Sequence, residues 1–326
     1  MKLDFNSARG LSATLQTLGF EMDVAQLSQG ALDGAFHLGG SRQLPVLSNQ
    51  TNQDLVLHGN RRPGMLPISL NTTDQQPVVR GEETHPGSLH GFHAGLTDTF
   101  FLLPSGAHIQ VALVSQTRLE QLATTTGDHQ VLEVIHGSNS ANLHPQRFQE
   151  ISALIQDQLM GVAQEDLVEV AMLEALTPHE LKGTASGELG VGTALMKDLV
   201  RWGFENSRQA ITLDDLSATI FASRSSIVQH CRQTFGTGPM ALLKQIRLAQ
   251  VQHALGEPDV QHAIRCRTVQ EVASHYGFQS RNHFARDYRN QFGESPRATL
   301  QRASDPGIGL QSVSVAQSPQ IAMARR

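Results

Sequence analysis

Two segments of the chain carry polar side chains whose types and spacing suit contact with nucleic-acid bases. Read at roughly 100° per residue, the second segment places these residues on one side of a helix: Arg281, Asn282, Ala285, Arg286 and Arg289. The first segment places these on the equivalent side: Ser225, Val228, Gln229 and Arg232. Arginine pairs bidentately with guanine, and asparagine or glutamine with adenine, so both faces could read base pairs in a DNA major groove.

These two faces lie in two copies of one six-position pattern, 57 residues apart. The copies are Ser223-x3-Ile227-x3-Cys231-x3-Phe235-Gly236-x2-Pro239 and Ser280-x3-Phe284-x3-Tyr288-x3-Phe292-Gly293-x2-Pro296. The serine suits a helix N-cap, the next three positions share one apolar face, and the glycine marks the helix end. Two copies of one supersecondary unit are therefore predicted. The alternative for each polar face is an ordinary solvated helix surface, but the duplication favours DNA contact.

The elements that position these faces are also visible in the sequence. A short helix is expected before each copy, opened by Thr212 with Asp215 and by Thr268 with Glu271, which resemble capping boxes. Residues 239–255 are apolar all round, which predicts a buried connecting helix roughly 25 Å long. Such a helix could present two recognition helices to one face of DNA about one turn, ~34 Å, apart.

This region resembles the AraC-type (AraC/XylS) transcription regulators, whose DNA-binding domain has two helix-turn-helix units joined by a long helix. The most specific part of the resemblance is "EVASHYGFQSRNHFARDYRNQFGESP". The resemblance implies a sequence-specific DNA-binding transcription regulator, with activation as the expectation. The chain departs from the family at Phe221, where glycine is frequent, at Cys231, where a bulkier residue is usual, and between Gly256 and Thr268, which is a few residues longer. We therefore expect the first unit to dock less typically than the second.

Charge is divided unevenly along the chain. The net charge of the 326 residues is −5, which alone would argue against a nucleic-acid partner. Residues 1–205 hold 11 basic and 22 acidic side chains, whereas residues 206–302 hold 12 basic and 7 acidic ones. The positive charge is thus confined to the duplicated region, as expected for a DNA-binding part.

The N-terminal region, residues 1–140, consists of short apolar runs separated by Gly, Pro, Asn and Asp. This texture predicts an all-β domain. The resemblance implies a cupin-like double-stranded β-helix that holds an effector, and "FLLPSGAHIQVALVS" resembles its final hairpin. The region also resembles, faintly, the subgroup of ethanolamine-utilisation regulators.

The sequence gives little support for metal binding, cysteine chemistry or catalysis. His85, His90 and His93 lie close together, but the carboxylate that usually follows in a cupin metal site is missing, so a polar loop is expected and no metal. Neither Cys231 nor Cys266 has metal-ligand spacing, which favours ordinary reduced thiols. No catalytic triad, phosphate loop or paired-carboxylate motif stands out, so we expect no enzyme and no cofactor.

Residues 141–181 are predicted to be helical, with one apolar stripe containing Phe148, Leu154 and Leu159. This stripe could pack on the β domain or, as the resemblance implies, join two subunits. Residues 182–192 have linker composition, 193–302 form the DNA-binding domain, and 303–326 are expected to be a disordered tail.

The expected fold is therefore α+β and multidomain: a cupin-like β domain, a helical dimerisation segment, and an all-α domain with two helix-turn-helix units. We expect a cytoplasmic homodimer that binds double-stranded DNA, because no membrane span or signal-peptide core is found. RNA polymerase and a small-molecule effector are further candidate partners. The alternatives are a cupin-type enzyme or ligand-binding protein, and a DNA-binding protein that needs no ligand.

Overall fold

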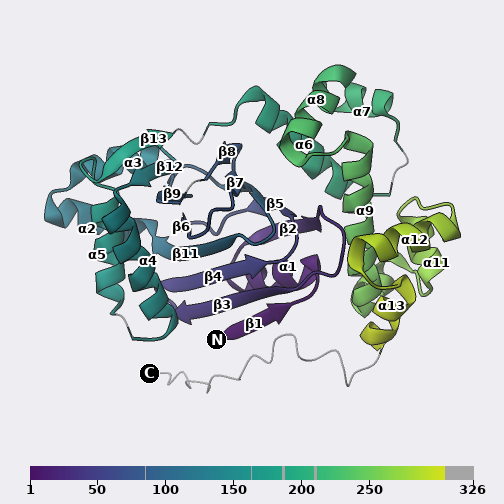
Figure 1. Cartoon of the computed structure of the whole chain (residues 1–326), viewed down its shortest axis with the longest axis horizontal. Helices are drawn as coiled ribbons and strands as arrows, with labels where there is room; N and C mark the ends of the chain where they lie inside the picture. Colours follow the sequence, from purple (N-terminus) through teal and green to yellow (C-terminus); the bar gives the residue numbers. More distant parts are fainter. Residues whose placement is uncertain (85, 163, 186–187, 209–210, 305–326) are drawn as a thin grey trace, which may run out of the picture.

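A computed structural model describes residues 1–304 except 85, 163, 186–187 and 209–210. Figure 1 shows strands gathered on one side of the molecule and an all-helical part on the other. The predicted fold class, a β-rich N-terminal region followed by helices, is confirmed. The expected tail at 303–326 lies outside the described residues from 305 onward.

Two antiparallel sheets form the N-terminal part. The eight-stranded sheet has, in spatial order, β1 (Lys2–Phe5), β3 (Gly34–Gly40), β4 (Pro45–Thr51), β11 (His108–Ser115), β6 (Met65–Asn71), β9 (Ser88–His90), β12 (Ser140–Leu143) and β13 (Leu181–Ala185). The five-stranded sheet has β2 (Glu21–Gln26), β5 (Leu55–Asn60), β10 (Asp98–Leu103), β7 (Val78–Val79) and β8 (Glu82–Glu83). Helix α1 (Ala8–Thr17) connects β1 to β2. The inner faces of both sheets bury apolar side chains such as Phe36, Leu57 and Leu113.

Two features of this part differ from expectation. The segment expected to be the final hairpin is not one, because β10 belongs to the five-stranded sheet and β11 to the eight-stranded sheet. The chain crosses between the sheets at Pro104–Ala107. Residues 182–185 of the expected linker form most of β13, which pairs antiparallel with β12. Small polar residues therefore form an edge strand here because a partner strand supplies the hydrogen bonds.

Four helices cover one end of the β-rich part: α2 (Gln116–Thr126), α3 (His129–Gly137), α4 (Pro145–Leu159) and α5 (Glu165–Ala175). Ile151 and Ile155 of α4 are fully buried in the same core as strand residues of β6 and β11. Phe148, Leu154 and Leu159 are partly buried against that core. The apolar stripe of α4 thus packs inside the subunit, which is the first of the two alternatives for this stripe.

The helical part begins with α6 (Val191–Glu205). It continues with α7 (Leu213–Thr219), α8 (Arg224–Phe235), α9 (Pro239–Gly256), α10 (Pro258–Ile264), α11 (Val269–His275), α12 (Arg281–Phe292) and α13 (Pro296–Ser304). Helix α9 runs between two groups of helices in Figure 1, and its apolar residues enter two separate cores. The connecting helix predicted at 239–255 is therefore present. The extra residues between Gly256 and Thr268 form α10.

The first group of helices shares its core with the five-stranded sheet. Val56, Phe100 and Leu102 from the sheet pack with Leu199 of α6 and Ile227 of α8. The rings of Phe100 and Phe235 meet edge to face, with centroids 6.3 Å apart. The β-rich part and the first unit are therefore joined by apolar packing. None of the described helices is long and apolar enough to cross a membrane.

Candidate nucleic-acid interface

Helix α8 is held at both ends by local interactions that its sequence predicts. The Ser226 amide donates to Ser223 Oγ over 3.1 Å, and Gly236 adopts φ 66° at the C-terminal end. Ile227 and Cys231 are fully buried, and Phe235 is partly buried. Burial raises the pKa of the Cys231 thiol to about 12. One side of α8 is therefore fixed against the core, which leaves the other side outward.

Helix α12 repeats this arrangement with larger side chains. Ser280 Oγ accepts from the His283 amide, and Gly293 adopts φ 70°. The buried rings of Phe284, Tyr288 and Phe292 follow one another at centroid distances of 5.7 and 4.7 Å. The hydroxyls of Tyr288 and Thr299 are 2.8 Å apart, which satisfies the phenol inside the core.

Both units open with the expected capping box. Thr212 Oγ1 accepts from the Asp215 amide, and the Asp215 carboxylate accepts from the Thr212 amide. Hydrogen bonds from the side chain and backbone of Thr212 lower the pKa of Asp215. Thr268 and Glu271 form the same reciprocal pair at the start of α11. The first helix of each unit is thus set by its own sequence.

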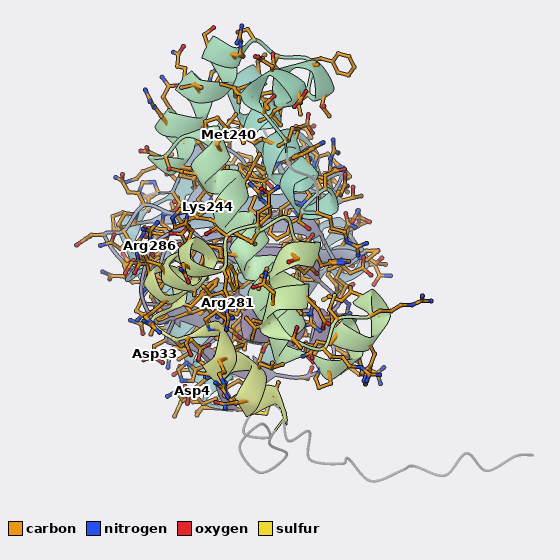
Figure 2. All side chains as sticks on the ribbon, turned by 90° about the vertical axis from the view of Figure 1, so that its right-hand side faces the viewer. Asp4, Asp33, Met240, Lys244, Arg281 and Arg286 are labelled. Carbon is orange, nitrogen blue, oxygen red and sulfur yellow. The ribbon has the colours of Figure 1, made fainter. Side chains whose placement is uncertain are left out.

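The predicted contact residues lie on the outward sides of the two helices. On α12, Arg281, Asn282, Arg286 and Arg289 are exposed and Ala285 is partly buried. On α8, Ser225, Gln229 and Arg232 are exposed and Val228 is partly buried. Figure 2 shows Arg281 and Arg286 on the side of the molecule that also carries Lys244 and Met240 of α9. Each unit therefore presents its predicted side chains to solvent.

Acidic neighbours modify the charge of both faces. Asp287 Oδ1 lies 3.5 Å from Arg286 Nε, and its Oδ2 lies 3.2 Å from Lys244 Nζ. Arg224, at the start of α8, pairs with Asp214 over 2.7 Å. Arg224 was not among the predicted contacts, although its position directly after the N-cap Ser223 places it at the helix end that usually enters the groove. His283 and Asn290 are further exposed residues of α12.

The helical part of the chain matches a known protein family. A family model described as a helix-turn-helix domain matches residues 216–302. The chain is similar to two Pseudomonas putida proteins, "XylDLEGF operon transcriptional activator 3" and "activator 2". The first is 28% identical over 42% of this chain and 39% of its own length, and the second is 31% identical over 33% and 67%. A solved AraC family transcriptional regulator from Rhodopseudomonas palustris is 34% identical over 34% of this chain and 97% of its own, with TM-score 0.30.

The chain belongs to the AraC family of transcription regulators. This confirms the family expected from residues 213–300, and the family consists of transcription regulators rather than enzymes. The match spans only 39% of the first Pseudomonas putida relative's length. The activity of the whole chain is therefore considered below as a proposal.

The departure from the AraC family at Phe221 has a clear backbone consequence. Phe221 directly follows the C-cap of α7 and adopts φ 53°. Gly277 directly follows the C-cap of α11, the equivalent position of the second unit, and adopts φ 79°. Both turns therefore require a left-handed residue, a conformation that glycine adopts without strain and phenylalanine adopts only at an energetic cost. The Phe221 side chain is 95% exposed. The first unit thus keeps the turn of an AraC-type unit at a cost in backbone strain.

His90 and His93, two of the three clustered histidines in the sequence, have different hydrogen-bond partners. The His90 ring is buried, with Nε2 2.7 Å from Ser88 Oγ, whereas His93 Nδ1 accepts from the Gly95 amide. His85 lies outside the described residues. Among the residues that are described, no group of three or more His, Cys, Asp or Glu side chains could hold a metal ion.

Proposed function

We propose that this chain is a sequence-specific DNA-binding transcription regulator whose two helix-turn-helix units enter adjacent major grooves. The observation that carries the proposal is the presence of two capped units with outward arginine-bearing faces on α8 and α12. The positive charge of residues 206–302 supports it, because phosphate contacts supply much of the affinity for DNA.

The two units are proposed to read DNA differently. On α12, Arg281 and Arg286 offer paired donors for base edges, and Asn282 offers a donor and an acceptor. Arg289 and Ala285 complete that face. On α8, only Gln229 can make a bidentate contact with adenine, while Val228 can touch a thymine methyl group. Ser225 and Arg232 are then assigned to the groove edge and the phosphate backbone.

Activation is the proposed regulatory outcome, with RNA polymerase as the partner. It is supported by the printed names of the two Pseudomonas putida relatives, both transcriptional activators. A regulator of this kind works where the bacterial chromosome lies, in the cytoplasm. Membership of the ethanolamine-utilisation subgroup stays a prediction from sequence, since these relatives are named for another operon.

A small-molecule effector is proposed to act through the β-rich part. A cavity of about 130 Å³ lies between the two sheets, and most of its lining side chains are apolar. Such a largely apolar cavity with a few polar groups is the usual form of a small-molecule site. This supports an effector-responsive regulator over a DNA-binding protein that needs no ligand. We keep the cupin-like ligand-binding protein as the second alternative, since it would use the same cavity.

The experiment that tests the proposal is selection of bound fragments from sheared DNA of the host genome by the full-length protein. Recovery of a shared motif with two half-sites about one helical turn apart is the expected result. Fragments without any shared motif, bound equally at all sequences, would reject sequence-specific regulation. A reporter driven by a recovered fragment then distinguishes activation from repression.

A further inference from the structure

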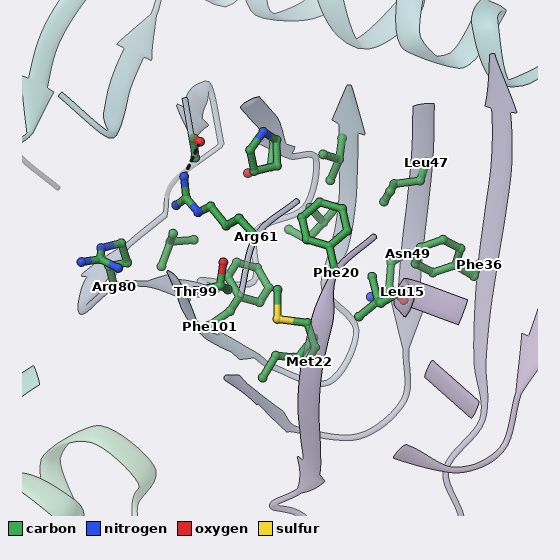
Figure 3. A pocket seen from close by; sticks show the side chains of 17 residues that line it. Leu15, Phe20, Met22, Phe36, Leu47, Asn49, Arg61, Arg80, Thr99 and Phe101 are labelled. Carbon is green, nitrogen blue, oxygen red and sulfur yellow. Dashed lines mark hydrogen bonds between the residues drawn. The ribbon is translucent and has the colours of Figure 1, made fainter. Parts of the chain in front are cut away.

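The cavity between the two sheets is apolar along most of its wall. Its lining includes Leu15, Phe20, Met22, Phe36 and Phe101 (Figure 3). A cavity of about 130 Å³ is close to the roughly 150 Å³ hole known to admit benzene. The apolar wall therefore suits a body of about the size of one aromatic ring.

One end of this cavity carries a buried guanidinium, Arg61, which is 7% exposed. Arg61 Nε donates to the carbonyl of Asp98 over 3.1 Å, and Nη1 donates to the carbonyl of Gly91 over 2.9 Å. Nη2 makes a longer contact, 3.4 Å, with Asn139 Oδ1. These bonds use three of the five N–H groups of an arginine. No carboxylate of the described residues forms an ion pair with Arg61.

The charges around Arg61 leave this end of the cavity positive. The carboxylate of Asp98 pairs with Arg80 over 2.9 Å and with Lys197 of α6. Asp98 is thus shared by two other cations. Burial and the nearby charge of Arg80 lower the pKa of Arg61 to about 10, so it still carries its charge at neutral pH. A buried cation without a paired carboxylate is stabilised by an added anion.

A second polar group lies at a distance from Arg61. Asn49 of β4 lines the cavity and is 8% exposed, and its Oδ1 has no hydrogen-bond partner among the described residues. Figure 3 shows Asn49 and Arg61 well separated, with Phe20 between them in that view. A buried amide oxygen without a partner is costly, so a ligand that bonds to it would remove that cost.

We infer that this cavity binds a small organic acid: a carboxylate held by Arg61, an apolar ring-sized body, and a hydroxyl group at the far end that bonds to Asn49. A hydroxyl both donates and accepts, so it suits either group of the amide. The inference rests on the proposed effector-responsive function and names the chemical class of the effector. The alternative is that Arg61 serves only to tie the carbonyls of Gly91 and Asp98 together.

The test uses the full-length protein without DNA and measures binding by calorimetry and thermal shift. The probes are para-hydroxybenzoate, benzoate, and the neutral methyl ester of para-hydroxybenzoate. We expect the hydroxy acid to bind roughly tenfold more tightly than benzoate, for one added buried hydrogen bond. We expect the ester to bind much more weakly than either acid, because it cannot pair with Arg61. Equal binding of acid and ester, or no binding of either acid at millimolar concentration, would overturn the inference.

The matched variant is Asn49→Leu, which replaces the amide by an apolar group of similar shape and should leave the fold intact. This variant should bind both acids but lose the preference for the hydroxylated one. A preference that persists in Asn49→Leu would remove Asn49 from the site. Arg61→Lys, which keeps the charge, should retain weaker acid binding. DNA selection without any acid is scored separately, so a protein that binds DNA specifically but no acid contradicts this inference and not the proposed function.

Discussion

Phe221 shows at the scale of a single residue how the first unit differs from the second. Its φ of 53° is a conformation that costs a non-glycine residue about 1 kcal/mol or more. Its side chain is 95% exposed, so little packing offsets that cost. The equivalent Gly277 meets the same backbone requirement without strain.

Replacing Phe221 by glycine should therefore stabilise the protein. We expect Phe221→Gly to raise the free energy of unfolding by about 0.5–1 kcal/mol, since relief of strain is partly offset by a more flexible unfolded chain. Urea unfolding of the purified variant measures this. Phe221→Ala, which removes the ring but keeps the Cβ atom, should change stability little, and an equal gain in both variants would show that strain is not the cause.

Arg286 carries the sharpest prediction about base reading. Its guanidinium is exposed on α12 and its ion pair with Asp287 is long, 3.5 Å, so it is available to a base edge. Arg286→Ala should cost about 1–3 kcal/mol on the selected site and relax preference at one or two base pairs. Competition binding against a set of singly altered sites measures both. An equal loss on random DNA would assign Arg286 to a phosphate instead, and Arg42→Ala, far from both units in the sequence, serves as the control.

His253 gives the protein a predicted sensitivity to acid. It lies on α9, its Nε2 has no hydrogen-bond partner among the described residues, and burial together with Arg9 lowers its pKa to about 4. In the unfolded chain the imidazole of His253 has its ordinary pKa of 6.5, so above that pH it is neutral in both states and does not lower the stability of the fold. The full free energy of unfolding is therefore present above pH 6.5. Part of it is lost progressively as the pH falls from about 6.5 to about 4.

Unfolding free energies measured across this range should therefore fall with decreasing pH, and less so in His253→Leu. The variant removes the ionisable group and keeps an apolar side chain at a mostly buried position. Burial and the nearby charge of Glu205 raise the pKa of Asp23, so protonation of Asp23 favours the folded state as the pH falls. Only the difference between the wild-type protein and His253→Leu therefore isolates the effect of His253. Parallel pH curves for both would contradict the assignment.

At the scale of elements, helices α8 and α12 could be predicted because every signal for them is local. Their N-cap serines, apolar repeats and terminal glycines lie within 14 residues, Ser223 to Gly236 and Ser280 to Gly293. Strand β13 could not be predicted, because its glycine-containing segment becomes a strand only by pairing with β12. Arg61 and Asn49 were missed for the same reason. They come from separate parts of the β-rich region, and only the fold brings them to one cavity.

The end of β2 and the residues that follow it also hold the α12 helix of the second unit. Gln26 Nε2 donates to the carbonyl of Gln291 over 2.9 Å, and Gln291 Nε2 donates to the carbonyl of Gln26 over 2.8 Å. Both side chains are buried. Gln245 of α9 adds a bond to the carbonyl of Leu27 over 2.6 Å. These contacts lie far apart in sequence and could not be predicted from it.

Removing the Gln291 side chain should loosen this contact. We expect Gln291→Ala to cost about 1–3 kcal/mol, because the buried Gln26 carbonyl loses the Gln291 donor and the Ser28 carbonyl keeps only its bond from Gln26 Nε2. Hydrogen exchange should become faster in residues 26–31 and in α12. Asn290→Ala, at an exposed neighbouring position, should leave both regions unchanged. Unaltered exchange in Gln291→Ala would mean that other contacts hold the two parts together.

At the scale of the whole molecule, the surface that could join two subunits differs from the stripe first considered. Leu154 is partly buried inside the subunit, whereas four apolar side chains near the α4–α5 turn and on α5 are exposed. They are Met160 (71% exposed), Val162 (76%), Leu167 (53%) and Val170 (38%). Clusters of exposed apolar side chains are typical of contact surfaces.

If this surface pairs two copies of the chain, Leu167→Glu should give a folded monomer with weaker binding to paired DNA sites. Light scattering after gel filtration measures the mass, and circular dichroism checks the fold. Leu154→Glu should instead destabilise the subunit, because it places a charge against the core. A wild-type protein that is monomeric at micromolar concentration would reject the pairing.

The apolar packing of Phe100 and Val56 against α6 and α8 has a consequence for how such a protein can change over evolutionary time. Many regulators are thought of as interchangeable modules, in which one sensor is exchanged for another by recombination in a flexible connection. Here a recombination point near residue 190 would cut through a shared interior and leave two non-matching apolar faces exposed. A successful exchange would have to carry the five-stranded sheet along with the first helix-turn-helix unit. We therefore expect the five-stranded sheet and the first helix-turn-helix unit to unfold together, in a single calorimetric transition.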